Sequence, residues 1–389
     1  MDFIKRVKIF HIVAILLAIT FLAFGWVFFS TRISDATKLQ VSEVEKEPVI
    51  ETKLPIDPKI NSRPKPASVS MKRMKSQGCV TDGLLSEYNP DWQEYVDLIN
   101  RSNCYYLHRA IETWLKPPDF ETIDFEMSQI KKKNVVYGMF LAEAIDTKAK
   151  YFNNNENRFF DFEKMCREGS VNPWGEHTCK PDFASKEYRD YLEYITHWAI
   201  DLGVQSFTFG QIYMQEGANA DYAPRIVKDM REYAKKKGVD IVIGAQTGNI
   251  QDEKYLQLFD YIEGGVGIDG EGNVEDGPCL SKRGGCWALL WHSNYAEKAK
   301  NVLLHLDWSG IKSDDLDIFA RMTQEKRAET LKSLYGKFNS EKTGFLMPVF
   351  GVLASDNGGC RGPKKKFYSS DSKYTCRDEK VINEILSKK

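Results

Sequence analysis

The sequence predicts an α/β protein whose larger part folds as a (β/α)8 barrel, the TIM-barrel architecture. After Cys79, eight short apolar segments alternate with amphipathic segments of helical spacing. The alternation extends over about 250 residues, which is the usual size of such a barrel. None of the apolar segments exceeds nine residues, and all are rich in Val, Ile, Tyr or Phe, as strands buried on both faces of a parallel sheet are. We therefore expect one barrel domain over residues 79–389.

The expected strands follow one another along the chain, with a helix or a long loop after each. They are Val80–Glu87, Cys104–Ala110, Val135–Ala142, Gln205–Gln211, Asp240–Gln246, Tyr261–Ile268, Val302–Asp307 and Gly344–Val352. The expected helices have apolar residues at three- and four-residue steps. They are Asp91–Arg101, Phe120–Lys132, Lys186–Leu202, Ala223–Lys237, Asp252–Phe259, Tyr295–Lys300 and Thr323–Phe338. Two long segments, 148–185 and 270–291, follow the third and sixth strands, where they would wall a cleft.

The segment before the barrel has two parts. No charged residue lies between Lys8 and Arg32, which is enough chain for a helix to cross roughly 30 Å of hydrocarbon. Basic residues precede this run, so we expect residues 1–30 to be a cytoplasmic tail and a transmembrane signal-anchor, with a cleaved signal peptide as the alternative. Residues 31–78 contain no Phe, Trp or Tyr and hold five prolines, which predicts a disordered linker or stem. The chain is then a single-pass membrane protein with an extracytoplasmic barrel.

All eight cysteines lie beyond the stem. Disulfide bonds persist in the oxidising compartments outside the cytoplasm, and an even number of cysteines there predicts a disulfide framework. Pairing of neighbours in the sequence gives one of about 105 possible connectivities. These pairs are Cys79–Cys104, Cys166–Cys179, Cys279–Cys286 and Cys360–Cys376. No Cys-x-x-Cys occurs, which disfavours zinc binding by the cysteines.

The charge of the chain excludes one class of partner. The whole sequence has 54 basic and 55 acidic residues, but residues 79–389 hold 48 acidic and 41 basic side chains. A nucleic-acid-binding domain needs a basic excess to neutralise phosphates, so nucleic acid is not an expected partner. An acidic, aromatic-rich domain is better suited to neutral or cationic glycans.

Polar side chains gather where the expected strands end. In a (β/α)8 barrel these carboxyl ends meet at the face that carries the active site. The carboxylates near these ends are Glu143, Glu216, Asp269 and Asp307. The amides, rings and guanidinium nearby are Arg109, Gln211, Tyr213, Gln246, Trp291 and Trp308. Such groups hydrogen-bond and stack on sugars, and two carboxyls of unequal pKa can cleave a glycosidic bond, so we expect an oligosaccharide or polysaccharide ligand.

With Asp307 and Trp308 after the seventh strand and Gln211 after the fourth, residues 79–355 resemble the large class of (β/α)8 glycoside hydrolases. The resemblance lies in the architecture, and it implies hydrolysis of glycans by carboxylate acid/base chemistry. The sequence departs from the class at the fourth strand. Many retaining members carry Asn-Glu there, and this chain has Gly210-Gln211.

The resemblance gives the carboxylates roles. Glu143 or Glu216 is the expected proton donor, Asp307 the base or nucleophile, and Asp269 a further catalytic candidate. The amide at Gln211, where an acid is usual, keeps a non-catalytic glycan-binding barrel open as an alternative.

A type II membrane glycosyltransferase is a second alternative, suggested by the short tail, the single anchor and the stem. The acidic sequence Asp315-Leu-Asp317 would then be its metal-binding motif. The eight-fold alternation of strands and helices does not suit a nucleotide-sugar fold, which disfavours this alternative.

No cofactor or metal is expected. His108 and His305 lie on expected strands and are interpreted as core residues, and no His-x-x-x-His motif occurs. The segment 269–275 has oxygen-bearing side chains at alternate positions, as a calcium loop does. The twelfth position is Leu280 where an EF-hand has a bidentate Glu, so an EF-hand is excluded.

Overall fold

The computed structural model of the protein describes residues 65–86, 92–216, 222–275, 289–308, 314–353 and 367–387. All of them belong to one compact unit, Lys53–Lys389. Within these ranges no helix is both long enough and apolar enough to cross a bilayer. The apolar run between Lys8 and Arg32, on which the membrane prediction depends, lies outside the described residues.

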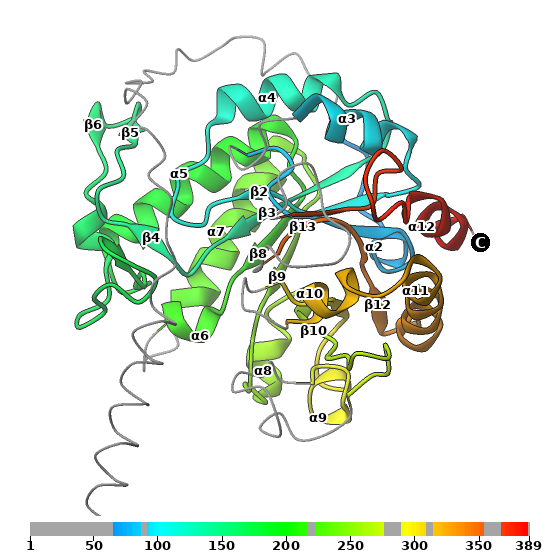
Figure 1. The fold of residues 1–389 in the computed structure, drawn as a ribbon. Helices are drawn as coiled ribbons and strands as arrows, with labels where there is room; N and C mark the ends of the chain where they lie inside the picture. Colours follow the sequence, from blue (N-terminus) through cyan, green and yellow to red (C-terminus); the bar gives the residue numbers. More distant parts are fainter. Residues whose placement is uncertain are drawn as a thin grey trace, which may run out of the picture. The chain divides into compact units, whose positions relative to one another are not determined.

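Nine strands form one parallel sheet that curves around a central axis (Figure 1). They are β1 (Gly78–Thr81), β2 (Tyr106–Glu112), β3 (Val136–Leu141), β8 (Ser206–Phe209), β9 (Val242–Ala245), β10 (Tyr261–Gly265), β11 (Val302–His305), β12 (Thr343–Phe345) and β13 (Met347–Val352). From β1 to β12 each strand pairs in parallel with the next member of this series. This order is the one expected from the sequence, and every expected strand is present.

The last expected strand closes the sheet into a barrel. It is divided by Leu346 into β12 and β13, which face different neighbours. β12 pairs with β11, with Thr343 opposite Val302, and β13 pairs with β1, with Met347 opposite Cys79. The backbone N–H of Leu346 donates to the carbonyl of Leu304, so the two halves are continuous. Eight strand positions therefore complete a parallel ring, as predicted.

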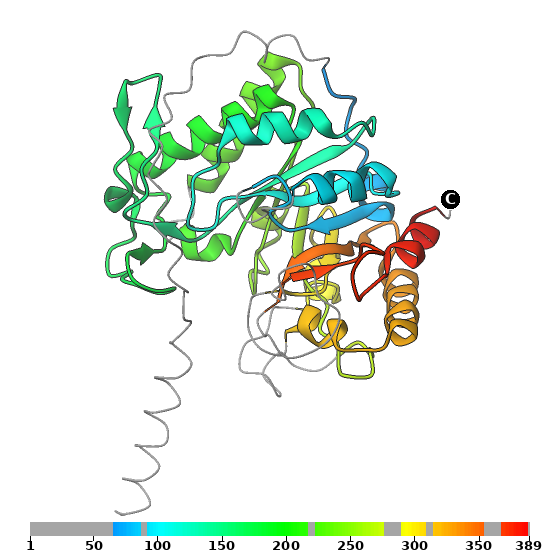
Figure 2. The same ribbon diagram turned by 45° about the horizontal axis from the view of Figure 1, so that its top comes forward.

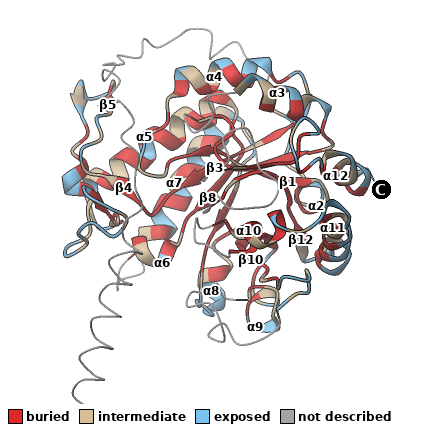
Figure 3. Ribbon diagram, viewed as in Figure 1, coloured by how far each residue is buried: buried red, intermediate tan, exposed pale blue. Residues whose placement is uncertain are grey.

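Helices lie outside this ring (Figures 1 and 2). They are α3 (Trp92–Arg101), α4 (Phe120–Gln129), α5 (Lys186–Leu202), α6 (Ile212–Gln215), α7 (Tyr222–Lys237), α8 (Glu253–Leu256), α9 (Ser293–Ala296), α10 (Asp315–Ala320), α11 (Gln324–Phe338) and α12 (Glu379–Leu386). The side chains of Asp119, Ser185 and Thr323 cap the first turns of α4, α5 and α11, which explains where these helices begin. The strands are buried, and the helices alternate between buried and exposed positions (Figure 3).

The first and last parts of the barrel domain were not predicted. Residues 65–78, which the sequence analysis assigned to the stem, are folded: helix α2 (Met71–Ser76) packs on β1 and β12, and Met74 is fully buried. The domain therefore begins before Cys79. The sequence did not indicate this start, because a six-residue helix without aromatic residues gives little signal. At the other end, β14 (Phe367–Ser369) adds antiparallel to β13.

A small subdomain follows β3 and begins just before the first predicted long segment, 148–185. It contains the short strands β4 (Ile145–Asp146), β5 (Phe152–Asn153), β6 (Arg158–Phe159) and β7 (Thr178–Cys179), and the helical turn η2 (Phe162–Met165). The predicted disulfide Cys166–Cys179 joins η2 to β7. The predicted disulfide Cys79–Cys104 is also present and joins β1 to the segment just before β2.

The two remaining predicted disulfides fall partly or wholly outside the described residues. Cys279, Cys286 and Cys360 are not described, and Cys376 is disulfide-bonded.

Two tyrosine rings fill the barrel near the amino ends of its strands. Tyr106 of β2 and Tyr261 of β10 are fully buried, and their hydroxyls lie 3.1 Å apart. Glycines on the neighbouring strands leave space for these rings: a Cβ at Gly244 would lie 2.0 Å from the Tyr261 ring, and one at Gly138 would lie 3.1 Å from Tyr106. The two rings therefore occupy the interior of the barrel.

Gly244→Ala is therefore expected to lower the free energy of unfolding by about 1–3 kcal/mol, the usual cost of overpacking a core. The Tyr261 ring cannot move aside freely, because its hydroxyl is bonded to Ser206 and Thr208 of β8. Urea unfolding measures the change. The matched control is Gly336→Ala in α11, where a Cβ meets nothing within 4 Å and helix propensity favours Ala by up to about 1 kcal/mol. Equal destabilisation of both variants would contradict this account.

Candidate active site at the carboxyl ends of the strands

Glu143 lies two residues beyond β3, inside the mouth of the barrel, and only 2% of it is exposed. The amide nitrogen Nε2 of Gln211, which follows β8, donates to its Oε1. Gly210 leaves the space that the carboxyl occupies, because a Cβ there would lie 2.2 Å from Oε2 of Glu143. Burial raises the pKa of Glu143, although the hydrogen bond from Gln211 opposes the rise. Glu143 therefore retains a proton at higher pH than an exposed glutamic acid does.

A chain of hydrogen bonds connects Glu143 to the neighbouring strands. The hydroxyl of Tyr213 donates to Oε1 of Gln211 over 2.8 Å. The backbone N–H of Gln211 donates to Oε1 of Gln246 over 3.1 Å, and Nε2 of Gln246 donates to Oε1 of Glu263 over 2.8 Å. The structure thus brings Glu143, Gln211, Tyr213 and Gln246 together at adjacent strand ends. Glu263 of β10 belongs to the same series of hydrogen bonds, but it was not among the site residues predicted from the sequence.

Arg109 lies on β2, the strand that pairs with β3. Its guanidinium carbon lies 3.7 Å from the centre of the Phe140 ring and 4.8 Å from that of Trp308. Nε of Arg109 lies 3.0 Å from Oε2 of Glu112 and 3.5 Å from Oδ1 of Asp82. Burial, together with the charge of Asp82, raises the pKa of Glu112 to about 8, although the guanidinium opposes the rise. Arg109 and Trp308 are therefore neighbours in this site.

Asp307 and Trp308 follow β11. Asp307 is half-buried, and its backbone N–H donates to Oδ2 of Asp315 over 3.3 Å. Trp308 is 6% exposed, and its ring centre lies 4.5 Å from that of His305. Trp308 contacts Arg109 in the middle of β2, so Asp307 is next in sequence to a residue that joins β2 to the segment after β11.

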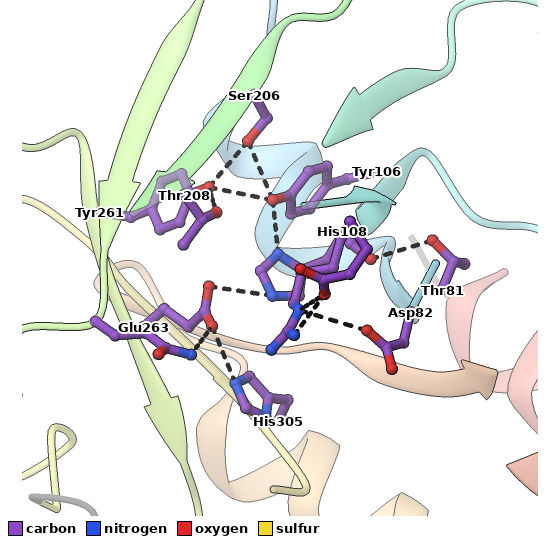
Figure 4. A network of polar contacts seen from close by, with 12 residues as sticks. Thr81, Asp82, Tyr106, His108, Ser206, Thr208, Tyr261, Glu263 and His305 are labelled. Atoms are coloured by element: carbon purple, nitrogen blue, oxygen red, sulfur yellow. Dashed lines mark hydrogen bonds and ion pairs between the residues drawn. The ribbon is translucent and has the colours of Figure 1, made fainter. Parts of the chain in front are cut away.

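A layer of ionisable residues lies directly below the mouth (Figure 4). Nε2 of His108 lies 3.1 Å from Oε2 of Glu263, and Nε2 of His305 lies 3.4 Å from Oε1. Each of the three residues is at most 2% exposed. Burial by itself would raise the pKa of Glu263, but the two imidazoles hold it well below the usual range. Burial also lowers the pKa of His108.

This layer was not predicted, although the sequence contains a signal for it. Alternation along a strand places Tyr261 and Glu263 on one face, and Tyr106 and His108 on one face. An inward-facing acid in the middle of an apolar strand requires a partner, and two strands with inward-facing histidines supply it.

Three predicted site residues have other roles. The carboxylate of Glu216 accepts from the backbone N–H of Ala223 and from the hydroxyl of Tyr255, which holds the start of α7. Asp269 accepts from the backbone N–H groups of residues 271 and 273 and so shapes its own turn. Trp291 packs in the helix layer, 5.4 Å from Phe338 at the end of α11. Their nearness to strand ends in the sequence misled the prediction, because only tertiary packing determines their direction.

The acidic motif of the glycosyltransferase alternative is also engaged. Asp315 accepts from the backbone N–H groups of Gly267 and Ile268, and Asp317 pairs with Arg321. These carboxylates organise α10 and the loop after β10, which weakens their interpretation as a metal motif.

Comparisons with known proteins give matches among solved structures alone. No family model and no curated protein matches the chain. The GH113 β-mannanase of Alicyclobacillus acidocaldarius shares 10% identity over 80% of this chain and 96% of its own, with a TM-score of 0.46. The cyclic α-maltosyl-(1→6)-maltose hydrolase of Arthrobacter globiformis shares 13% over 85% and 79%, with a TM-score of 0.45. These matches are glycoside hydrolases.

A GH27 β-L-arabinopyranosidase from Geobacillus stearothermophilus also matches, at 10% identity and a TM-score of 0.28 over 51% of this chain. The match spans half of that enzyme's length, and a match to an α-galactosidase from Thermus thermophilus spans 41% of its length.

Proposed function

We propose that the protein is a glycoside hydrolase in which Glu143 donates a proton to the leaving oxygen. The observation that carries this proposal is the position of Glu143: a buried carboxyl of raised pKa at the carboxyl end of β3, held by the amide of Gln211. A general acid must be protonated at the working pH, and burial is a common means to that end. Oε2 of Glu143 is buried and makes no hydrogen bond with the described residues, so no described acceptor competes for a proton on it.

Asp307 is the proposed base or nucleophile, since it follows β11 beside Trp308. Arg109, Gln211, Tyr213, Gln246 and Trp308 are the proposed walls of the sugar site. The distance between the carboxyls of Glu143 and Asp307 in the substrate complex would determine the stereochemistry: about 5–5.5 Å gives retention and about 6.5–9.5 Å gives inversion.

The glycan is proposed to belong to the cell envelope or the extracellular space. Support comes from the uncharged run between Lys8 and Arg32 and from the disulfides Cys79–Cys104 and Cys166–Cys179, which are rare in reducing compartments. We propose a single-pass protein with a cytoplasmic N-terminus and an external barrel.

The pH dependence of hydrolysis tests the assignment of the acid. We expect kcat/KM for 4-methylumbelliferyl glycosides to fall as the pH rises through the raised pKa of Glu143, because an acid without its proton cannot donate. Gln211→Leu removes the amide that opposes the rise in the pKa of Glu143. The fall in kcat/KM at alkaline pH, the alkaline limb of the profile, should therefore move to higher pH. Glu216→Gln is the control and should leave the limb in place. An unmoved limb in Gln211→Leu would remove the support for Glu143.

A non-catalytic glycan-binding barrel is the second candidate. It is favoured by the contact of Gln211 with Glu143, which covers the carboxyl, and by the exposed Tyr213 ring beside it. This candidate predicts that Asp307→Asn still binds glycan and that no glycoside of either anomeric form is hydrolysed by the wild-type chain.

A further inference from the structure

Three side chains from three strands converge inside the barrel below the proposed glycan site. They are His108 of β2, Glu263 of β10 and His305 of β11, and one nitrogen or oxygen atom of each lies within 4.8 Å of the others. Ligand atoms about 2.0–2.1 Å from a tetrahedral Zn²⁺ lie about 3.3–3.4 Å from each other. The observed separations of 3.1 and 3.4 Å between the Nε2 atoms and the carboxylate are close to this spacing.

The contacts within the group are poor as hydrogen bonds. Three atoms have no hydrogen-bond partner of acceptable geometry among the described residues: Nε2 of His108, Nε2 of His305 and Oε2 of Glu263. Nδ1 of His305 lies 3.1 Å from the carbonyl oxygen of Leu306, which can only accept, so Nδ1 is the donor in this contact. Its Nε2 faces Oε1 of Glu263 at 3.4 Å without a hydrogen bond of acceptable geometry. A cation between the imidazole nitrogens and the carboxylate would satisfy these buried atoms.

The outer partners are those of a metal site. Metal-bound histidines are usually fixed through their second ring nitrogen. Nδ1 of His108 lies 2.8 Å from the Tyr106 hydroxyl, as Nδ1 of His305 lies near Leu306. The carboxylate of Glu263 is oriented by Nε2 of Gln246 over 2.8 Å.

The charge of Glu263 also lacks a permanent partner in the described part of the chain. Its ion-pair contacts there are the two histidines, and the guanidinium of Arg109 pairs with Glu112 and Asp82. A buried carboxylate without a cation is costly.

We propose that His108, Glu263 and His305 bind one divalent transition-metal ion, with Zn²⁺ as the ion that best suits two imidazoles and a carboxylate. Three protein ligands leave the fourth position to water, as in zinc sites that take part in chemistry. The site joins β2, β10 and β11 inside the barrel. No metal was expected from the sequence, because His108 and His305 were interpreted as ordinary core residues.

The test uses the full chain in detergent, stripped with a chelator and then titrated with Zn²⁺. We expect one Zn²⁺ per chain by mass spectrometry of the metal and a higher Tm with Zn²⁺ present. Co²⁺ in the same site should give visible absorption bands. Glu263→Gln should weaken Zn²⁺ binding at least 100-fold, and Gln246→Ala about 10–100-fold, as loss of an outer partner does.

The matched control is His197→Gln. His197 lies with Glu193 and Asp229 in a second group of the same ligand types, but that group lies at the surface. This variant should bind Zn²⁺ as the wild type does. If Glu263→Gln fails to fold by circular dichroism, His305→Gln replaces it.

Two results would overturn the proposal: folded wild-type protein that binds no stoichiometric Zn²⁺, or unchanged affinity in the folded ligand variants. Both measurements need no substrate, so they stand apart from the outcome of the hydrolysis assays.

Discussion

Glu143→Gln is expected to reduce kcat/KM for glycosides with poor leaving groups by about 10²–10⁴-fold, the usual contribution of a positioned acid. The amide cannot donate the proton that the leaving oxygen needs, but its oxygen can still accept from Nε2 of Gln211, so the local structure should persist. Substrates with activated leaving groups need less protonation and should lose less. Rates for a series of aryl glycosides of falling leaving-group pKa measure this difference.

Glu216→Gln is the matched control for the same experiment, since Glu216 is also buried near a strand end but holds Ala223 and Tyr255. Its rates should stay near those of the wild type once both variants are shown to be folded. An equal loss for every leaving group in Glu143→Gln would mean that Glu143 shapes the site without donating a proton.

Arg327→Met is expected to lower the free energy of unfolding by about 3–5 kcal/mol. Arg327 of α11 and Asp378 form a buried ion pair, with side chains 3% and 0% exposed and Nε 2.7 Å from Oδ2. The same guanidinium donates to the carbonyls of Met322 and Cys376. Methionine fills a similar volume but removes the positive charge beside Asp378 and the two donations to the carbonyls, so among the described residues the Tyr368 hydroxyl alone would remain as a side-chain donor to Oδ2 of Asp378. Urea unfolding, followed by circular dichroism, gives the change.

The double variant Arg327→Met/Asp378→Asn should recover part of the loss, because it removes the unpaired buried charge. Lys186→Met is the surface control: Lys186 pairs with Asp190, and its side chain is 77% exposed, so the change should stay within about 0.5 kcal/mol. A loss in the double variant as large as in Arg327→Met would contradict the role assigned to the charge.

The strands were predictable because each carries an apolar run bounded by polar turns. Val136–Leu141 and Val302–His305 fall inside the expected ranges, and helix α5 has the expected bounds Lys186–Leu202. The first strand was placed too late: the expected range Val80–Glu87 continues past Thr81 into the turn at Asp82-Gly83, where Gly83 has a positive φ. Apolar residues after a turn resemble a strand when only the sequence is known.

The candidate site was predictable at neighbouring strand ends and not elsewhere. Glu143, Gln211 and Gln246 meet because parallel strands bring their carboxyl ends together. Trp291 lies far along a loop, so its direction depended on packing against Phe338, which no local pattern encodes. His108 was read as an ordinary core residue because its partners come from strands more than 150 positions later.

The division of the last strand at Leu346 has a consequence for how the chain folds. β13 is the element that seals the sheet against β1, so a chain that has emerged only as far as β11 has open strand edges at both sides of the sheet. Contacts between residues near 79 and 347 close a very long loop, which slows folding. Open edges are also templates for pairing with another chain. Completion of the barrel must therefore wait for nearly the whole domain to be synthesised, and the interval before it is the period in which the protein is most exposed to aggregation.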